Sequence, residues 1–553
     1  MAYHKTLPFF VPRHMAAICL LCLAWILPGL IGHDPWKPDE AYSFGLVYHI
    51  LQGGDWVVPT LANEPFMEKP PLFYLSAALF AWMLSPLLPL HEGAILTSGF
   101  YMALTFLFVG LSGRELYGKE SGLIAPIILL GCIGLLVRAH QLITDVSMLA
   151  GFAMGLYGLA LSLRRPVLAG LWLGTGVGIG FMSKGLIVPG VLGVVSLLLP
   201  VLFKCWRNRG YANCLLVALV AATPWLTIWP FALYQRSPAL FVEWFWLNNL
   251  GSFFGHVVLA GTGKGYTFYL KLLPWYAWPA LPLALWALWK HKSVILNAPG
   301  IQLPLITFLV MLLVLSLAAN ARELYALPML LPLSLLATAS LETLPGGAAR
   351  ALNWLGIVVF GSIAMLLWIG WMALMTNHPA VIAAFLENYQ PGFKSKFGSL
   401  TFGIALTYTV LWLVTVCRSH RSNFQTVINW ACGITLIWAL TMTLWLPILD
   451  AGKSYRSMIA SLQQALPEKY QCVSSRALGE GQRAMLEYFA GIITYRMEIP
   501  GRNKNCDLLL TQDSAQSQGV PEGSWEKIWE GNRPGDKDER YRLYRRIDFL
   551  AGY

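Results

Sequence analysis

Charged side chains are scarce in this chain. They make up 12% of its 553 residues, against roughly 25% in soluble globular domains. Apolar residues reach 56% and the mean hydropathy is +0.57. This composition excludes an ordinary soluble protein and indicates an integral membrane protein. The 39 Lys and Arg residues do not form one basic stripe but are scattered between apolar runs, so we expect no nucleic-acid partner despite the net charge of +11.

Cysteine is also uncommon outside the apolar runs. Seven of the nine cysteines lie in or beside such runs, where an apolar packing role is expected. The other two, Cys472 and Cys506, lie in a polar C-terminal region. An oxidising compartment allows a disulfide between them, but the spacing alone leaves the pairing open. A small-residue cleavage pattern is lacking after the first apolar run, so we expect that run to remain as an anchor.

Fourteen apolar runs are long enough to cross about 30 Å of hydrocarbon: 15–32, 71–90, 92–112, 121–137, 146–163, 167–183, 185–203, 211–231, 270–289, 302–319, 325–342, 352–375, 399–417 and 426–447. The run at 71–90 decides the topology. If it lies in the membrane interface, the short basic loops fall on the same side as the basic N-terminus, as the positive-inside rule requires. Its prolines, Pro86 and Pro89, also suit an interfacial helix. We predict about thirteen transmembrane helices, with the N-terminus inside and the C-terminus outside.

The polar segments define the domain organisation. The membrane domain spans 1–450 and includes a long first outer loop at 33–91. Residues 451–553 regain charge and show strand patterns at 470–475, 506–511, 525–529 and 540–546, with a helix pattern at 480–495. The predicted fold class is an all-α polytopic membrane protein with a small α/β domain on the outer side.

Two acidic motifs stand in the first outer loop. They are Trp36-Lys37-Pro38-Asp39-Glu40 and Met67-Glu68-Lys69-Pro70-Pro71. Acidic groups beside hydrocarbon are costly to keep there, so they mark a functional site by default. Three more polar features follow at the outer ends of apolar runs: Asp145, the turn Met182-Ser183-Lys184-Gly185 and the segment Arg322-Glu323-Leu324-Tyr325-Ala326-Leu327-Pro328.

This set of motifs, in this order and in these loops, resembles the bacterial lipid A 4-amino-4-deoxy-L-arabinose transferases. They belong to the GT-C superfamily, in which the protein O-mannosyltransferases are relatives. The resemblance implies an enzyme that takes a sugar from undecaprenyl phosphate and transfers it to lipid A or another envelope glycan. It places the active site on the periplasmic face of the bacterial inner membrane, with the donor tail among the membrane lipids.

The implied donor carries a phosphate, and three basic residues are candidates for binding it. Lys69 offers three N–H donors on a flexible stem. Arg322, at the outer end of a span, is a second clamp. Lys184 either reaches the lipid phosphate or directs its ammonium group to the interface.

Asp39 is the first candidate for catalysis. A carboxylate beside an acceptor hydroxyl acts as a general base. An acceptor phosphate is already largely ionised near neutral pH, and Asp39 then orients it and supports charge at the anomeric carbon. The alternative is a purely structural role, as the N-cap of a helix expected at 40–52.

Four residues complete the predicted substrate groove. Asp145 is either a direct binding or catalytic residue or a helix cap paired with Arg138. Glu40 is explained equally by a first-turn acid at a helix N-terminus. Tyr325 either stacks on the sugar and gates the groove or belongs to an aromatic belt.

A divalent metal is a further expectation. Glu68 supplies a carboxylate oxygen and His256 an imidazole. Two ligands make only a partial site, and His256 is equally explained as an interfacial histidine.

One departure from the family pattern affects substrate choice. The family continues Asp-Glu-Ala with Arg-Tyr, where this chain has Tyr42-Ser43. Without the family's arginine, the chain lacks at this position a guanidinium that can bind phosphate or carboxylate through two hydrogen bonds. The donor sugar and acceptor therefore stay open, with a mannosyltransferase-like enzyme acting on protein or another glycan as the alternative.

Two other classes of protein are alternatives to an enzyme. In a transporter we would expect charged residues at mid-bilayer on broken helices. A non-catalytic envelope receptor would not need Asp39 and Lys69 beside lipid.

Overall fold

The computed structural model describes residues 12–118, 121–255, 267–418, 422–499, 506–514 and 525–547. Within these ranges, eight helices are long and apolar enough to cross a membrane. They are α4 (Leu90–Tyr117), α6 (Thr144–Leu161), α7 (Pro166–Lys184), α9 (Arg209–Arg236), α14 (Pro299–Leu317), α16 (Gly346–Thr376), α18 (Ser399–Cys417) and α19 (Asn423–Leu444). The protein is therefore a multi-pass membrane protein, as its composition predicted.

Five other predicted spans are short or broken. The run at 121–137 bends by 66° between Gly122–Leu130, which contains η1 (Ser121–Ile124) and α5 (Ala125–Leu130), and Ile133–His140, which contains η2 (Ile133–Leu135) and η3 (Arg138–His140). The remaining spans correspond to α1 (Pro12–Ile26), α8 (Ile187–Leu202), α12 (Phe268–Tyr276) with α13 (Ala280–Lys290), and η7 (Glu323–Met329) with α15 (Leu330–Thr338). The count of thirteen and the orientation stay predictions, because helix length alone does not place a membrane.

The first outer loop folds against the ends of these helices. It contains α2 (Asp39–Leu51), a hairpin of β1 (Thr60–Leu61) and β2 (Glu64–Pro65), and α3 (Leu72–Leu84). The hairpin turn places Ala62 and Asn63 at φ 45° and 62°, the backbone of a type I′ turn. With 13 residues, α3 is about 20 Å long, shorter than the hydrocarbon layer, in agreement with the predicted interfacial role.

A lateral arm follows α9. It consists of α10 (Pro238–Val242), the π-helix η5 (Glu243–Gly251) and α11 (Ser252–Phe254). A hydrophobic cluster separate from the main core packs this arm against the first loop and the end of α7, with Met67, Phe181, Met182, Trp229, Leu233 and Trp244 among its buried residues. The remaining short helices are η4 (Lys204–Trp206), η6 (Ile295–Asn297) and α17 (Ala380–Tyr389).

The C-terminal part contains a five-stranded mixed sheet. It follows α20 (Leu446–Lys453) and α21 (Arg456–Ala465), and its strands are β3 (Val473–Arg476), β4 (Thr494–Arg496), β5 (Leu508–Ser514), β6 (Trp525–Gly531) and β7 (Glu539–Arg546), in the order β4-β3-β5-β7-β6. The four predicted strands are confirmed, and β4 was missed. The predicted helix at 480–495 ends early, as α22 (Glu480–Ala490), because Gly491 takes a left-handed φ of 67°. Cys472 and Cys506, whose pairing the sequence left open, form a disulfide.

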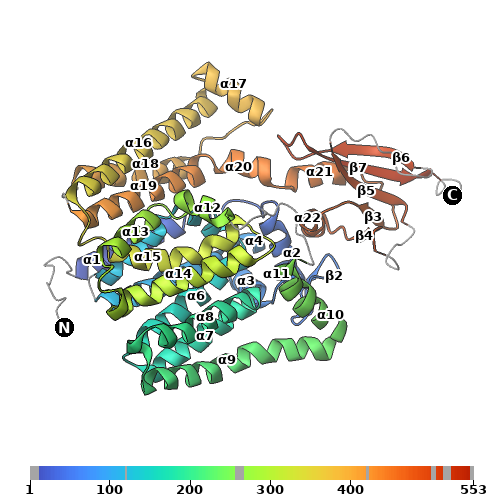
Figure 1. The fold of residues 1–553 in the computed structure, drawn as a ribbon. Coiled ribbons are helices and arrows are strands. Elements are labelled where there is room, and N and C mark those ends of the chain that lie inside the picture. Colours follow the sequence, from blue (N-terminus) through green and yellow to red (C-terminus); the bar gives the residue numbers. More distant parts are fainter. Residues whose placement is uncertain are drawn as a thin grey trace.

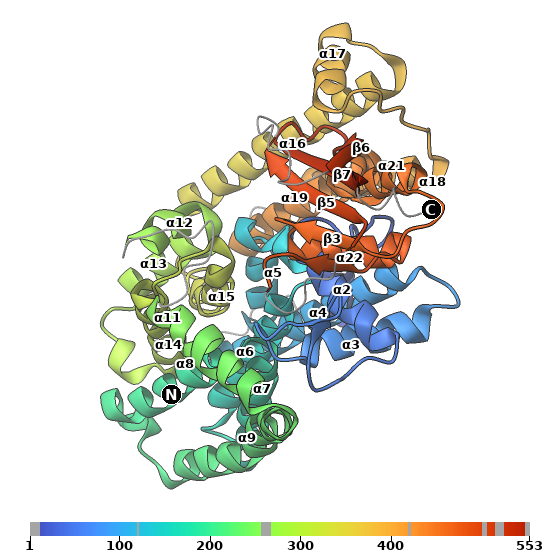
Figure 2. The same cartoon turned by 90° about the vertical axis from the view of Figure 1, so that its right-hand side faces the viewer.

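The sheet domain docks on the first loop, at the end of the helical bundle opposite the start of α1 (Figure 1). In both views α22 lies beside α2, with β3 next to it (Figure 2). The contact is close, because a Cβ built on Gly45 of α2 would lie 2.5 Å from the Cβ of Ala484 in α22. The C-terminal domain therefore covers the helix that begins with Asp39.

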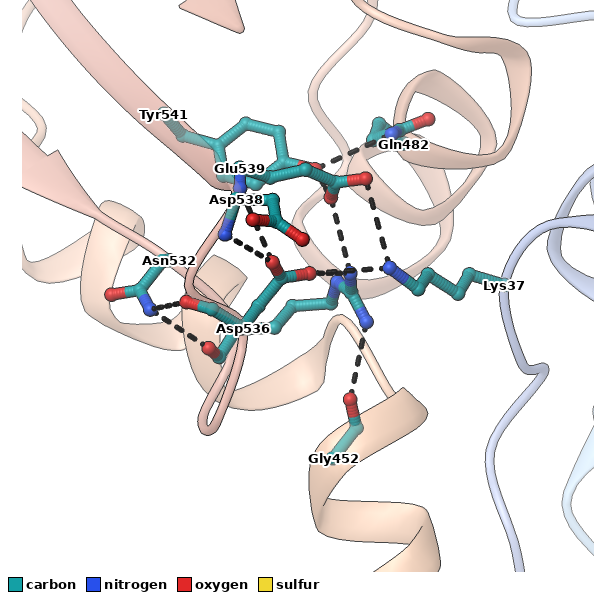
Figure 3. A network of polar contacts seen from close by, with 9 residues as sticks. Lys37, Gly452, Gln482, Asn532, Asp536, Asp538, Glu539 and Tyr541 are labelled. Atoms are coloured by element: carbon teal, nitrogen blue, oxygen red, sulfur yellow. Dashed lines mark hydrogen bonds and ion pairs between the residues drawn. The ribbon is translucent and has the colours of Figure 1, made fainter. Parts of the chain in front are cut away.

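Ion pairs complete this interface. Lys37 contacts Asp536 at 3.2 Å and Glu539 at 3.6 Å, and both acids pair with the buried Arg533 (Figure 3). The guanidinium of Arg533 also donates to the carbonyl of Gly452. The segment just before Asp39 is thus held by side chains from the far end of the sequence.

Candidate functional site

Charged side chains at the ends of α2, η3 and η7 form one group. Asp39 is the first residue of α2, and its Oδ2 lies 4.0 Å from Nη1 of Arg138. Arg138 also pairs with Glu323, at the start of η7. Arg138 thus connects two acids from distant segments, and all three side chains are partly exposed.

Asp39 does not act as the predicted N-cap. Pro38 occupies the cap position, and no side-chain hydrogen bond caps α2. The N-cap interpretation of Asp39 is therefore wrong, since its carboxylate lies in the first turn and faces Arg138.

Lys69 lies beside α2. Its Nζ donates a hydrogen bond of 2.6 Å to the Tyr42 hydroxyl and lies 3.8 Å from Glu68. Burial alone lowers the pKa of Lys69, but the carboxylate of Glu68 and other neighbours outweigh it and raise the pKa well above its usual value. Lys69 therefore remains a cation at neutral pH.

Asp145 pairs with a different base from the predicted one. It is the second residue of α6, 1% exposed, and it bonds Lys184 at the end of α7. The predicted pairing with Arg138 as a helix cap is wrong. Lys184 Nζ lies 4.7 Å from the ring centre of Tyr325. Lys184 therefore connects the end of α7 with α6, through Asp145, and with η7, through Tyr325.

The two lysine clusters are close enough to interact electrostatically. The charge of Asp145 acts on Lys69, and those of Lys69 and Glu68 act on Lys184. Among the described residues, the buried oxygens near these clusters without a hydrogen-bond partner include Oδ2 of Asp145 and the Tyr74 hydroxyl. Buried polar atoms without partners are rare. Together with two cations they form a region suited to an anionic ligand with hydroxyl groups.

Glu40 is placed differently from the other predicted residues. Its side chain is buried and accepts hydrogen bonds from the backbone N–H groups of Trp36 and Leu142. Burial raises the pKa of this carboxyl. Glu40 ties the start of α2 to the segment between Arg138 and Asp145, which is a positioning role.

Arg322 directly precedes η7 and acts electrostatically on Tyr325. Its carbonyl accepts a hydrogen bond of 3.4 Å from Tyr269. The structure therefore places Arg322 next to Glu323 and Tyr325, within the predicted group.

The metal hypothesis gains no support from the described part of the chain. His256 lies outside the described residues, and the residues that are described include no group of three or more His, Cys, Asp or Glu side chains able to hold an ion. Glu68 contacts the ammonium of Lys69, which opposes a second cation. We derive no chemical step through a metal, and its use stays a prediction.

Some functional neighbours were not predicted from the sequence. Glu323 stands inside the quoted Arg-Glu-Leu-Tyr motif, but only folding shows that it pairs with Arg138. Tyr42 was singled out as a departure from a family pattern, and the structure makes it the partner of Lys69. Tyr74 gave no signal, because an aromatic residue in an apolar run is ordinary.

One family model matches part of the chain. Residues 68–229 match the family model of dolichyl-phosphate-mannose-protein mannosyltransferases. The matched region begins at Glu68 and contains Lys69, Asp145 and Lys184.

Full-length relatives carry a consistent name. The undecaprenyl phosphate-alpha-4-amino-4-deoxy-L-arabinose arabinosyl transferase of Serratia proteamaculans is 24% identical over 502 residues, covering 86% of this chain and 86% of the relative. The enzyme of the same name from Yersinia pestis is also 24% identical, over 514 residues and 88% of both chains.

Solved structures agree with this fold. ArnT from Cupriavidus metallidurans, bound to undecaprenyl phosphate, superposes with a TM-score of 0.69 and 15% identity, covering 98% of this chain and 100% of that one. The apo state of that protein gives a TM-score of 0.67 at 16% identity, covering 98% of this chain and 99% of that one. At these identities the superposition establishes the fold, including the small C-terminal sheet domain.

Proposed function

We propose that this chain, which belongs to the aminoarabinose transferase family of the GT-C glycosyltransferases, transfers a sugar from undecaprenyl phosphate to an envelope glycan. The leading donor sugar is 4-amino-4-deoxy-L-arabinose and the leading acceptor is lipid A. The reaction takes place on the periplasmic side of the bacterial inner membrane.

One observation carries the proposal: the charges of Lys69 and Lys184 act on each other, and Tyr42, which contacts Lys69, also lies within the electrostatic reach of Asp39 in the first turn of α2. The pair of Lys69 and Lys184 suits the phosphate of a lipid-linked donor, since ammonium groups make charge-assisted hydrogen bonds to phosphate oxygens. The donor headgroup lies at the membrane surface while its tail stays in lipid, so a site at helix ends is where the two meet.

The reaction is a displacement at the anomeric carbon. An oxygen of the acceptor forms a bond to that carbon while the bond to the phosphate oxygen of undecaprenyl phosphate breaks, and the leaving phosphate keeps the electron pair. Lys69 stabilises this leaving group, which carries more negative charge in the transition state than in the donor. A phosphate acceptor needs no deprotonation, so Asp39 then orients it and supports positive charge at the anomeric carbon. With a hydroxyl acceptor, Asp39 accepts the proton.

The second candidate is transfer of mannose or another sugar to protein or a different glycan. It is favoured by the family-model match to protein mannosyltransferases over residues 68–229. The replacement of the family's Arg-Tyr by Tyr42-Ser43 also bears on substrate choice, because Tyr42 contacts Lys69. A transporter is disfavoured, because its charged residues are expected at mid-bilayer on broken helices. Here Asp39, Lys69 and Lys184 lie at or near the ends of helices.

Mass spectrometry of lipid A and core oligosaccharide decides between these acceptors. Cells that express the chain should show a sugar-sized mass increase on lipid A that is absent from cells expressing the Asp39→Asn variant. A pentosamine mass supports 4-amino-4-deoxy-L-arabinose, and another value names a different sugar. If lipid A and core are unchanged in both strains, the lipid A proposal is wrong and envelope proteins become the acceptors to analyse.

A further inference from the structure

Two consecutive asparagines of the π-helix η5 contact the two lysine-bearing segments. Nδ2 of Asn248 donates a hydrogen bond of 2.9 Å to the carbonyl of Met67, two residues before Lys69. Oδ1 of Asn249 accepts a hydrogen bond of 3.3 Å from the N–H of Leu186, two residues after Lys184. Because adjacent residues on a helix point in different directions, each amide can serve a different segment.

The Asn249 amide is itself fixed. Its Nδ2 donates a hydrogen bond of 2.8 Å to the carbonyl of Trp244, within the same π-helix. The turn after Lys184 lies directly on this amide, because a Cβ built on Gly185 would lie 1.9 Å from Oδ1 of Asn249. Gly185 also has a φ of +71°, which other residues rarely adopt. Both the backbone angle and the close approach therefore require glycine here.

Apolar packing holds η5 in this place. Trp244 is buried in the same cluster as Met67 and Met182, and its ring lies 5.9 Å from that of Phe181. Trp229 of α9 stacks edge-on against Trp244 at 4.8 Å and donates a hydrogen bond to the carbonyl of Val57 in the first loop. The cluster contains residues next to both lysine segments, so η5 is rigidly connected to each of them.

We propose that Asn248 and Asn249 are positioning residues that set the distance between the Lys69 and Lys184 ammonium groups. The inference rests on the proposed function, in which both lysines bind the donor phosphate. The hydrogen bonds of both amides go to backbone groups. They act through the Met67–Lys69 and Lys184–Leu186 backbone, and π-helical turns of this kind occur frequently at functional sites.

The test uses the purified full-length protein and measures undecaprenyl-phosphate affinity with kcat and KM for transfer. Asn248→Asp keeps the side-chain shape but loses the N–H donor and places an anion against the Met67 carbonyl. We expect binding to weaken about tenfold, as for a lost buried hydrogen bond, with a higher KM and also a lower kcat, because Lys69 stabilises the leaving phosphate in the transition state. Asn249→Asp keeps the acceptor for Leu186 and loses only the bond to Trp244, so a smaller change is expected.

Asn63→Asp is the matched control. Asn63 is exposed at the tip of the β1–β2 turn with a φ of 62°, which Asp tolerates. This variant should bind like the parent protein. Thermal unfolding is recorded for every variant, and Asn248→Ala, which removes the donor without adding charge, replaces Asn248→Asp if the latter does not fold.

A double-mutant cycle separates positioning from general structural damage. In a Lys69→Ala background, Asn248→Asp should weaken binding little further, because the group that it positions is gone. If its full effect persists in that background, or if Asn248→Asp and Asn248→Ala both bind like the parent, the positioning role is wrong. If the parent protein itself does not bind undecaprenyl phosphate, the proposed function fails instead.

Discussion

Asp39 and Asp145 are both first-turn acids, yet their surroundings differ. The Asp39 side chain is 25% exposed and its nearest cation, on Arg138, lies 4.0 Å away. Asp145 is 1% exposed and bonded to Lys184. The carboxylate of Asp39 is accessible to a ligand, whereas that of Asp145 is buried in its pair with Lys184. Burial and partners therefore distinguish two acids that the residue type alone does not.

We predict that Asp39→Asn preserves the fold and reduces transfer by about a hundredfold or more, since it removes only the charge of the group that the proposed mechanism places at the anomeric carbon. Transfer is measured with purified protein, and thermal unfolding reports the fold. Asp55→Asn is the matched control, because Asp55 lies in the same loop but pairs with Arg236. Near-parental transfer by Asp39→Asn excludes Asp39 from catalysis.

Lys69 gives a second prediction at this scale. Lys69→Ala should weaken undecaprenyl-phosphate binding roughly tenfold to a hundredfold, because a charge-assisted hydrogen bond in a buried site contributes about 1.5–3 kcal/mol. Lys69→Arg should recover only part, since a planar fork does not replace a compact ammonium. Binding to the purified protein is the measurement, with Asp39→Asn expected to bind almost normally. Parental affinity in Lys69→Ala makes Lys184 or Arg322 the better phosphate ligand.

The two helices of the first outer loop, α2 and α3, differ in how far they are buried. Residues 40–47 of α2 are all buried, covered by the bundle on one side and by α22 on the other. By contrast, α3 is short and exposes Leu79, Trp82 and Met83. A short apolar helix with an exposed aromatic residue fits the membrane interface, where Trp is enriched. The placement of α3 sets the side of every later loop.

Thiol labelling tests the placement of α3. In intact cells, Ser85→Cys after α3 and Gln52→Cys before it should both react with a membrane-impermeant thiol reagent added from outside. Both positions are exposed in the structure. The native, exposed Cys205, in a loop predicted to be cytoplasmic, should react only after lysis. Labelling of Gln52→Cys without Ser85→Cys means that α3 crosses the bilayer, and the thirteen-helix topology is then wrong.

The whole molecule is held together by ion pairs between the first loop and the C-terminal domain. Arg483 of α22 is almost fully buried and pairs with Glu64 of the hairpin at 2.9 Å. Arg456 pairs with Asp34, and Lys37 with Asp536. These contacts join residues more than 400 positions apart. The C-terminal domain is thus part of the framework that fixes α2 and, with it, Asp39.

Glu64→Gln should destabilise the docked C-terminal domain by about 3 kcal/mol, because it leaves the buried guanidinium of Arg483 without its ionic partner. The measurement is the free energy of unfolding, with hydrogen exchange in α22 as the local readout. Lys527→Met, which breaks the exposed pair with Glu530, should cost less than 1 kcal/mol. Equal effects of the two substitutions contradict the role given to Arg483.

The same interface predicts a dependence on pH. Burial alone raises the pKa of Asp34 and Asp536, but hydrogen bonds and cations outweigh it and hold both below their usual 3.8. Their ionised forms therefore favour the docked state. This contribution is complete above the unfolded pKa and is lost as the pH falls below 3.8 through the lowered folded values. After correction for the intrinsic exchange rate, the protection of the amides in α21 and α22 against hydrogen exchange should fall over that range, and Asp34→Asn should reduce the change.

The sequence by itself determined the class of the protein and supplied the candidate residues for its chemistry. Long apolar runs with few charges are stable as helices that span a lipid bilayer. Alternating patterns after Asp450 predicted four of the five strands. Acids beside hydrocarbon are costly, and this alone made Asp39, Glu68 and Asp145 candidates for the site. The short β4 was missed since three residues carry almost no periodic signal.

Only the tertiary structure decided which of these groups act together. Asp145 pairs with Lys184 instead of Arg138, Arg138 reaches Glu323 across 185 positions, and Tyr42 contacts Lys69. Such pairings depend on how helix ends are brought together by packing, and no local pattern encodes them. The same holds for Asn248 and Asn249. Their proposed positioning role follows only from the segments that they contact in the folded protein.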